Sequence, residues 1–426
     1  MAKVHFIDVT NRDGVQAPRM NLSKFQKTML NWYLGRLGIH QSEMGFPMVE
    51  HEQNYIKANL QLQGMGALGK MVLSGWCRAV AADVRASLPT GLKDFNLSIS
   101  TSDQMIRNKF QGKLDRASVI KEMVEAVRVA REGGARTIGA NAEDASRTDM
   151  EYLVEFALAA KEAGAQRLRY CDTVGYESPH SIEARVYELA TRTQMTIELH
   201  CHDDLGMAVA NSIAGARGAL EAGQDTWINT SANGIGERAG GADLLSCILA
   251  FKYGRGLDQY EMGDPIDLTV AWPLTNYVAD VLGIPIPVNQ PGVGANMFTH
   301  ESGIHADGAL KDRQNYELYD YPVLGIPDQT CAVTGRSITT GEYGGMGGFK
   351  HVYQRLGITF DDDEQAHYIL NLVQFVNAHN HMPFIDDELR FIARYPEQVR
   401  QLLTVNPPPS KGSPALKAIG NRISRE

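Results

Sequence analysis

The chain has 426 residues, of which 43% are hydrophobic and 21% charged, and its net charge is -9 at pH 7. This composition excludes a disordered or collagen-like chain, and the acidic balance without a dense basic stripe argues against a nucleic-acid partner. No apolar run could span a bilayer, no signal-peptide layout precedes the first strand-like pattern, and the five scattered cysteines form no CxxC pair. We therefore expect a cytoplasmic protein with free thiols and no membrane partner.

Eight β-rich runs alternate with eight helical patterns. The expected strands are 4–10, 40–46, 71–77, 95–102, 135–142, 167–174, 196–202 and 225–235. The expected helices are 23–37, 50–62, 79–88, 118–132, 149–163, 180–193, 205–222 and 239–252. Strand followed by helix, repeated eight times, predicts an α/β fold of the closed (β/α)8 type, the TIM barrel. An open doubly wound sheet is the alternative, but it more often begins with a glycine-rich dinucleotide turn, which is absent here.

The pattern changes after the eighth helix. We expect the barrel to occupy residues 1–256 and a proline-interrupted linker with short helices to follow at 257–291. Residues 292–405 are helical and glycine-rich, and they form a helical C-terminal extension of the barrel. The segment 406–426 is basic and begins with a run of prolines, so a loose tail is expected there.

Polar residues follow the expected strands at the end where TIM barrels place their chemistry. His200 and His202 are two apart on the seventh strand, so both rings face the barrel mouth. Asp13, after the first strand, lies close to them once the barrel closes. Two imidazoles and a carboxylate suit a divalent ion such as zinc, manganese, iron or cobalt. A pair of hydrogen-bonded histidines is the alternative for an isolated HxH, but the convergence of polar strand ends favours a metal site.

Three further residues at strand ends have two interpretations each. Arg12 is a fixed cation beside the expected metal, suited to a carboxylate or a developing enolate oxygen, although arginines more often form surface ion pairs. Glu143 and Thr173 could line the pocket or cap the helices that follow them.

Four motifs resemble those of the DRE-TIM metallolyases, and specifically the branch of 2-isopropylmalate, citramalate, homocitrate and Re-face citrate synthases. The motifs are Asp8-Val-Thr-Asn-Arg-Asp-Gly-Val-Gln16, Leu199-His-Cys-His-Asp-Asp-Leu-Gly206, Asn233-Gly-Ile-Gly-Glu-Arg-Ala-Gly240, and His300-Glu-Ser-Gly-Ile-His-Ala-Asp-Gly308 with Tyr316-Glu317. They occur in the order of the family, and the resemblance extends from about residue 4 to about residue 405.

The resemblance implies a metal-dependent Claisen condensation of acetyl-CoA with a 2-oxo acid and release of CoA. It implies a divalent ion (Mn, Mg, Zn or Co) and a homodimer in which the region after the barrel completes the partner's active site. It assigns the metal to Asp13, His200 and His202, enolate or carbonyl stabilisation to Arg12, the 2-oxo acid site to Gln16, Glu43 and Thr173, and proton transfer to Glu143, His305 and Tyr316.

Two departures from the family pattern bear on the substrate. Gly241 stands where isopropylmalate synthases have a metal-ligating asparagine, and Gly139 stands where homocitrate synthases usually have an arginine. Arg107 is then the candidate cation for a second substrate carboxylate. We expect a dicarboxylic 2-oxo acid, oxaloacetate or 2-oxoglutarate. The alternatives are an isopropylmalate or citramalate synthase, or a lyase resembling HMG-CoA lyase; such a lyase usually has a cysteine in the loop after the eighth strand, and Cys247 lies beyond that loop.

Overall fold

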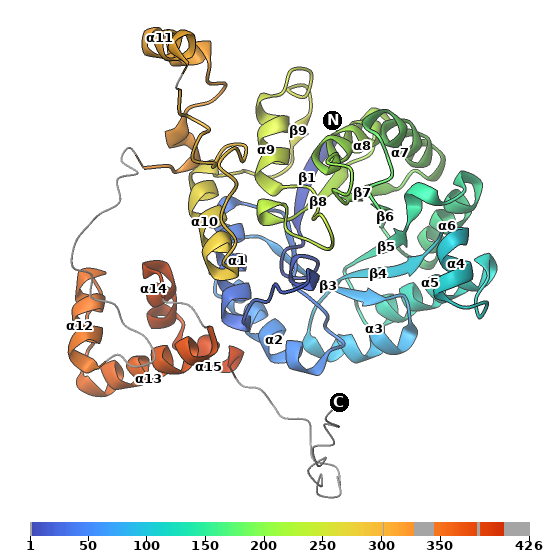
Figure 1. Ribbon diagram of the computed structural model, residues 1–426. Coiled ribbons are helices and arrows are strands. Elements are labelled where there is room, and N and C mark those ends of the chain that lie inside the picture. Colours follow the sequence, from blue (N-terminus) through green and yellow to red (C-terminus); the bar gives the residue numbers. More distant parts are fainter. Residues whose placement is uncertain (1, 301, 328–344, 381–383, 404–426) are drawn as a thin grey trace, which may run out of the picture.

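The computed structural model describes residues 2–300, 302–327, 345–380 and 384–403. Its centre is a closed barrel of eight parallel strands, in which β1 pairs with both β8 and β2 (Figure 1). The strands are β1 (Lys3–Asp8), β2 (Gln41–Glu43), β3 (Val72–Arg78), β4 (Asp94–Ser100), β5 (Thr137–Glu143), β6 (Arg167–Asp172), β7 (Thr196–Cys201) and β8 (Thr226–Thr230). The predicted TIM barrel is confirmed.

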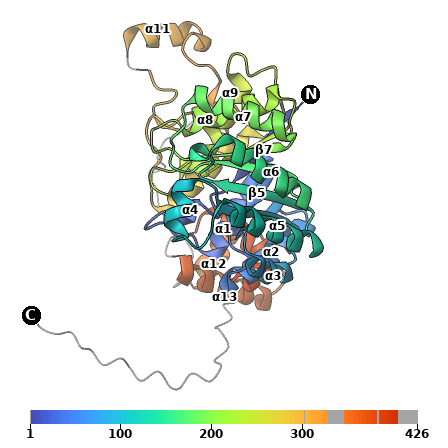
Figure 2. The ribbon, with the colours of Figure 1, turned by 90° about the vertical axis from the view of Figure 1, so that its right-hand side faces the viewer.

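Each strand is followed by a helix that covers the outside of the barrel (Figures 1 and 2). The helices are α1 (Lys24–Leu37), α2 (Glu50–Gly64), α3 (Ala81–Ser87), α4 (Asp103–Lys109), α5 (Arg116–Glu132), α6 (Met150–Ala163), α7 (Pro179–Thr193), α8 (Ala208–Glu221) and α9 (Leu244–Tyr253). Many begin at a side-chain cap; Ser23, for example, forms a capping box with Gln26 at the start of α1.

Several strands are shorter than expected because the chain leaves the ladder before its apolar pattern ends. The run predicted at 225–235 forms β8 only as far as Thr230. The chain then turns, and Asn233 adopts a left-handed conformation with a φ of 59°.

The segment expected to be a linker contains regular structure. A short strand, β9 (Glu261–Met262), pairs in parallel with the start of β1, beside the point where β2 joins it. Helix α10 (Ala271–Leu282) then packs against α1. The chain after α9 is therefore tied to the start of β1 through β9, and α10 also contacts the turn after β8, where Asn233 Nδ2 donates to the Thr275 carbonyl oxygen.

The C-terminal extension divides into two parts. Helix α11 (Gly303–Lys311) stands away from the barrel, at the top in both views (Figures 1 and 2). The helices α12 (Met346–Arg355), α13 (Asp363–Asn380), α14 (Asp386–Arg394) and α15 (Pro396–Leu402) form a cluster beside α1 and α2, where Phe25 contacts the rings of Phe384 and Phe391. The expected tail, 406–426, lies outside the described residues.

The described part of the chain bears on two features of the sequence, the apolar segments and the cysteines. No helix in those residues is long and apolar enough to cross a membrane. Within the same residues, Cys77, Cys171, Cys201 and Cys247 are free and buried, and Cys331 lies outside them.

The contact between α10 and α14 predicts a pH-dependent stability. Buried Glu388 accepts hydrogen bonds from the Tyr277 hydroxyl and the Ile385 amide, each at 3.1 Å, and burial raises its pKa from 4.5 to about 7. The folded protein therefore binds a proton on Glu388 more tightly than the unfolded chain does. The contribution of this group to the free energy of unfolding is most favourable below pH 4.5 and is lost as the pH rises through about 7. The difference in the pKa of Glu388 between the unfolded and folded states corresponds to about 3 kcal/mol in the free energy of unfolding.

We expect Glu388→Gln to remove this loss and to make the protein more stable than wild type above pH 7. Denaturant unfolding between pH 5 and pH 8 measures it, with the exposed Glu364→Gln as the control. An unchanged pH slope in Glu388→Gln would contradict the assignment.

Candidate active site

A cavity opens at the C-terminal ends of the strands, as the sequence predicts for a TIM barrel. Seven of the predicted site residues line it: Arg12, Asp13, Gln16, Glu143, Thr173, His200 and His202. Glu43, Arg107, His305 and Tyr316 are not among the lining residues. The cavity also contains side chains that the sequence did not single out: Trp76, Ser98, Asn141, Arg169, Cys171, Glu237 and Arg238.

The donor atoms of Asp13, His200 and His202 all lie within 4.8 Å of one another, and the three residues are buried. Burial lowers the pKa of both histidines, well below 6.5 for His200, so both rings are neutral at pH 7. For Asp13, burial opposes ionisation most strongly, but the Arg12 guanidinium together with His200 and His202 keeps the pKa of the carboxyl below 3.8. Neutral imidazoles and an ionised carboxylate are the protonation states that bind a divalent ion.

The surroundings of His202 also suit a ligand. Its Nδ1 lies 3.2 Å from the carbonyl oxygen of Gly240. A hydrogen bond donated from Nδ1 leaves Nε2 as the atom that faces a metal, which is the usual arrangement for a ligating histidine. At Gly241, the next residue, a Cβ would come no closer than 3.4 Å to its nearest neighbour, the Cys201 carbonyl oxygen. A Cβ would therefore fit there without a clash.

Arg12 is held by two carboxylates. Its Nη1 donates to Asp13 Oδ1 at 2.7 Å and its Nε donates to Glu43 Oε1 at 2.6 Å. Glu43 is fully buried beneath the cavity and also accepts from Arg169 Nη2 at 2.8 Å and from Asn96 Nδ2 at 2.5 Å. Burial alone would raise the pKa of Glu43, but Arg169 and Arg12 hold it well below its usual value. The geometry makes Glu43 a support for Arg12.

Sequence reasoning missed Arg169, although a signal was available. Arg167 and Arg169 alternate on β6 and point into the barrel interior. Arg169 is 1% exposed and is paired on its other side with Glu198, Nε to Oε2 at 2.7 Å. Because an isolated buried charge is costly, two arginines on a buried strand indicate partner carboxylates inside the barrel.

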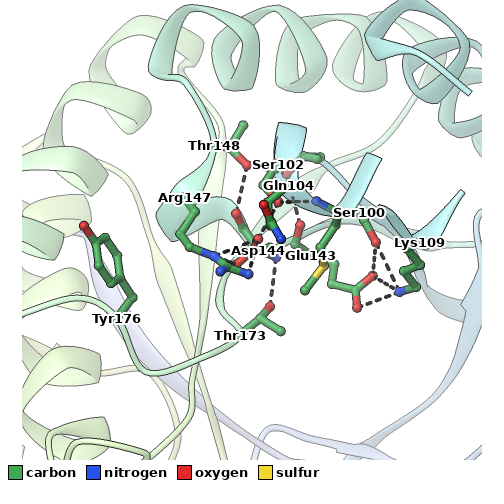
Figure 3. Close-up of polar contacts among 12 residues, drawn as sticks. Ser100, Ser102, Gln104, Lys109, Glu143, Asp144, Arg147, Thr148, Thr173 and Tyr176 are labelled. Atoms are coloured by element: carbon green, nitrogen blue, oxygen red, sulfur yellow. Dashed lines mark hydrogen bonds and ion pairs between the residues drawn. The ribbon is translucent and has the colours of Figure 1, made fainter. Parts of the chain in front are cut away.

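Glu143 lies at the end of β5 among polar contacts with the loops after β4 and β6 (Figure 3). Ser100 Oγ donates to its Oε2 at 2.5 Å, and Lys109 Nζ lies 2.6 and 2.8 Å from its two oxygens. Glu143 is partly exposed, and its Lys109 partner is half exposed. The carboxylate is therefore accessible from the cavity and is held by a cation that solvent can reach.

The next residue fixes the direction of this loop. Asp144 has a φ of 67°, a left-handed conformation, and its carboxylate accepts from Ser102 and Arg147. Its backbone N–H donates to Thr173 Oγ1 at 2.8 Å (Figure 3). The Thr173 hydroxyl therefore has its proton available for an acceptor in the cavity.

The cation of α4 that reaches the strand ends is Lys109. Arg107 and Lys109 are both exposed and neither lines the cavity, but Lys109 is ion-paired with Glu143. Helix α4 has only seven residues, too few for a periodic pattern to show which side chains face the barrel. The sequence alone therefore does not decide whether Arg107 or Lys109 reaches the strand ends. Arg238 is a second cation at the mouth; it pairs with Asp204, Nε to Oδ1 at 2.8 Å, and donates to the Thr173 carbonyl oxygen.

His305 and Tyr316 lie together but away from the barrel mouth of their own chain. Their rings stack with centroids 4.1 Å apart, and His300 Nε2 lies 3.0 Å from Glu317 Oε1 beside them. His305 lies on α11, which stands away from the barrel (Figure 1). The structure thus brings the predicted residues together as two groups, one in the mouth and one on the extension.

The fold and the donor set at its mouth define a TIM-barrel enzyme with a site suited to a divalent ion. Residues 3–277 match the HMGL-like family, and residues 293–380 match the homocitrate synthase post-HMGL domain-like family. The chain belongs to the HMGL-like family, in its synthase branch of acyl-transferring enzymes.

Named relatives cover nearly the whole chain. It is 50% identical over 411 residues to the citrate (Re)-synthase of Dehalococcoides mccartyi, covering 96% of this chain and 99% of that protein. It is 36% identical to 2-isopropylmalate synthase 2 of Caldanaerobacter subterraneus, covering 91% and 94%, and 32% identical to a homocitrate synthase of Methanothermobacter thermautotrophicus, covering 91% and 92%. The HMG-CoA lyase of Bacillus subtilis has a TM-score of 0.56 at 19% identity, covering 67% of this chain and 96% of that one, which shows the fold alone.

Proposed function

We propose that this protein condenses acetyl-CoA with a 2-oxo dicarboxylic acid, oxaloacetate in the first place, and releases CoA and citrate. The observation that carries the proposal is the convergence of Asp13, His200 and His202 with Arg12 and Glu143 in one cavity. The similarity to a citrate (Re)-synthase over nearly the full length supports the choice of product.

A divalent ion held by Asp13, His200 and His202 would act as a Lewis acid on the keto oxygen of the 2-oxo acid. Arg12, fixed by Asp13 and Glu43, presents its remaining N–H groups to the oxygen on which negative charge develops. Thr173 donates a hydrogen bond to the substrate carboxylate, and Gln16, which also lines the cavity, is a further hydrogen-bonding group.

Proton transfer is assigned to Glu143 together with His305 and Tyr316 of the partner subunit. The thioester α-proton is weakly acidic, so its removal needs a base within hydrogen-bonding distance. Glu143 is ion-paired with Lys109 in the free protein. Binding of an anionic substrate near Lys109 would release Glu143 for this task. A homodimer would bring the His305–Tyr316 group to the mouth of the neighbouring barrel.

Gly139 supports oxaloacetate over the longer 2-oxoglutarate. A Cβ at this position would lie 2.4 Å from the side-chain oxygen of Asn96, a residue whose Nδ2 donates to Glu43. An arginine at residue 139 therefore has no room while the Asn96–Glu43–Arg169 network is in place.

The substrate is tested by measuring CoA release from acetyl-CoA with oxaloacetate, 2-oxoglutarate, 2-oxoisovalerate and pyruvate. We expect kcat/KM to be highest with oxaloacetate. Highest turnover of 2-oxoisovalerate would contradict the dicarboxylate proposal and favour an isopropylmalate synthase.

The cation that binds the second carboxylate is tested with a matched pair on one helix. We expect Lys109→Ala to raise KM for oxaloacetate about 10- to 150-fold, since a charged hydrogen bond contributes roughly 1.5–3 kcal/mol, and to leave KM for pyruvate nearly unchanged. Arg107→Ala removes the same charge from an exposed position and is the control. A large effect of Arg107→Ala with none from Lys109→Ala would reverse this assignment.

The lyase alternative needs a reactive thiol, and neither Cys171 nor Cys247 provides one. Cys171 lines the cavity, but burial raises its pKa to about 12, and Cys247 is buried inside α9 with a pKa well above 9 for the same reason. Neither thiol is ionised at neutral pH, so neither is suited to the role that a loop cysteine has in such lyases.

A further inference from the structure

A second cluster of metal-ligating side chains lies at the opposite end of the barrel from the active site. His5 is on β1, His40 immediately precedes β2, and Asp264 follows β9, which pairs with the start of β1, so all three lie near the end of the barrel where β1 and β2 begin. His5 Nδ1 is 2.6 Å from Asp264 Oδ2, and His40 Nδ1 is 3.0 Å from Asp264 Oδ1. One donor atom from each residue lies within 4.8 Å of those of the other two.

The backbone is shaped to bring these three segments together. The loop that carries Asp264 hydrogen-bonds to β1 through the Gly263 amide and the Val4 carbonyl oxygen, 2.8 Å apart. A Cβ at Gly263 would lie 2.0 Å from the His5 ring, so only glycine permits this approach. On the other side, a Cβ at Gly38 would lie 2.3 Å from the Pro265 carbonyl oxygen. Two close glycine contacts therefore hold the carboxylate against both rings.

The cluster has a closed side and an open side. The His5 ring stacks on Trp227, with centroids 4.4 Å apart and an interplanar angle of 15°, and Arg167 lies behind Trp227 in the barrel interior. The side chains of His5, Asp264 and His40 are 12%, 16% and 28% exposed. Lys3, which precedes His5 on β1, is ion-paired with Glu261 and leaves the carboxylate of Asp264 to the histidines. Solvent can therefore reach the donors from outside and complete a coordination shell.

We propose that His5, His40 and Asp264 form a second divalent-metal site, of the zinc type, at the N-terminal face of the barrel. Two imidazoles and a carboxylate suit zinc, cobalt, nickel or copper better than magnesium or calcium. The hydrogen-bonded separations of 2.6 and 3.0 Å are shorter than the roughly 3.3–3.6 Å between neighbouring ligands of a tetrahedral ion with bonds of about 2.0–2.2 Å, so an ion would need each ring to move from the carboxylate by less than about 1 Å. An ion there would tie β1, the start of β2 and the segment after β9 together, a stabilising role consistent with that face of a TIM barrel.

Without an ion, the same contacts form a hydrogen-bonded clamp, in which each ring donates one N–H to the carboxylate. A hydrogen-bonded clamp binds no ion and a metal site binds one, so the number of ions bound per chain distinguishes the two. The proposal does not depend on the condensation reaction, because it is tested in protein whose active-site donor set has been removed.

The experiment uses the full chain carrying His200→Ala and His202→Ala, stripped with chelator and dialysed against Zn²⁺. We expect about one ion per chain in this background, and Kd values weakened at least about 10-fold when Asp264→Asn or His40→Gln is added. The exposed His180→Gln is the matched control and should change nothing. Thermal melting should show a metal-dependent rise in Tm that Asp264→Asn removes.

The fluorescence of Trp227 reports on metal binding at this site without any substitution of His5, His40 or Asp264. Binding of Cu²⁺ or Co²⁺ beside the stacked His5 ring should quench tryptophan fluorescence in the background protein, and Trp227→Phe should remove most of that quenching. The proposal is overturned if the background binds less than about 0.2 ion per chain, or if stoichiometry and quenching persist in both Asp264→Asn and His40→Gln.

Discussion

Replacement of His202 by alanine is expected to abolish condensation and to remove the ion from the barrel mouth. His202 is one of three donors, and its loss leaves Asp13 and His200, too few to hold a catalytic ion tightly. Lewis-acid stabilisation of a developing alkoxide contributes several kcal/mol, so kcat/KM should fall by at least about 10³-fold.

The measurements are CoA release with oxaloacetate and metal content after dialysis. His180→Ala, at an exposed position on α7, controls for loss of a histidine elsewhere. Asp13→Asn should reproduce the loss of activity, because the ionised carboxylate both faces the histidines and holds Arg12. Full metal at the mouth and full turnover in His202→Ala would refute the assignment of the ligands.

The fold could be predicted because its signals are local and repeated. Eight alternations of a strand pattern with a helix pattern specify the barrel, and the HxH spacing places His200 and His202 on one side of β7. Once the barrel closes, its topology brings Asp13 of the first strand to them. The position of these three residues can therefore be predicted from the closure of the barrel alone, without other long-range contacts.

Features that depend on long-range packing could not be predicted in the same way. The two-residue β9 has no periodicity of its own and exists because β1 has a free edge below β2. Glu43 was expected to contact substrate, but the interior charges of Arg12 and Arg169 occupy both its oxygens. The choice between Arg107 and Lys109 depends on where a short helix begins, which no pattern in the sequence determines.

The division of the site residues between the mouth and the extension leads to a second large expected effect. His305 and Tyr316 belong to a group that stands away from its own barrel, with Ile304 75% and Leu310 88% exposed beside it. Such a large exposed apolar surface on a protruding helix fits an interface with another copy of the chain. In a symmetric dimer, each extension would then complete the neighbouring barrel.

We therefore expect two inactive variants to restore activity when their subunits are mixed. Arg12→Ala damages the mouth, and His305→Ala damages the extension. Half of the dimers in an equal mixture contain one subunit of each kind, and in these only the barrel of the His305→Ala subunit receives an intact His305, so about a quarter of wild-type activity should return. If each chain used its own extension, both sites of every mixed dimer would stay defective.

The control mixes Arg12→Ala with Asp13→Asn, which damage the same part of the site, and it should remain inactive. Differently tagged subunits, unfolded and refolded together, allow mixed dimers to be purified and counted before assay. Mixed dimers of Arg12→Ala and His305→Ala that form in normal yield and show no CoA release would exclude a shared site. Activity in those dimers and none in the control would place the His305–Tyr316 group at the partner's mouth, because no arrangement within one chain restores a defect carried on the other.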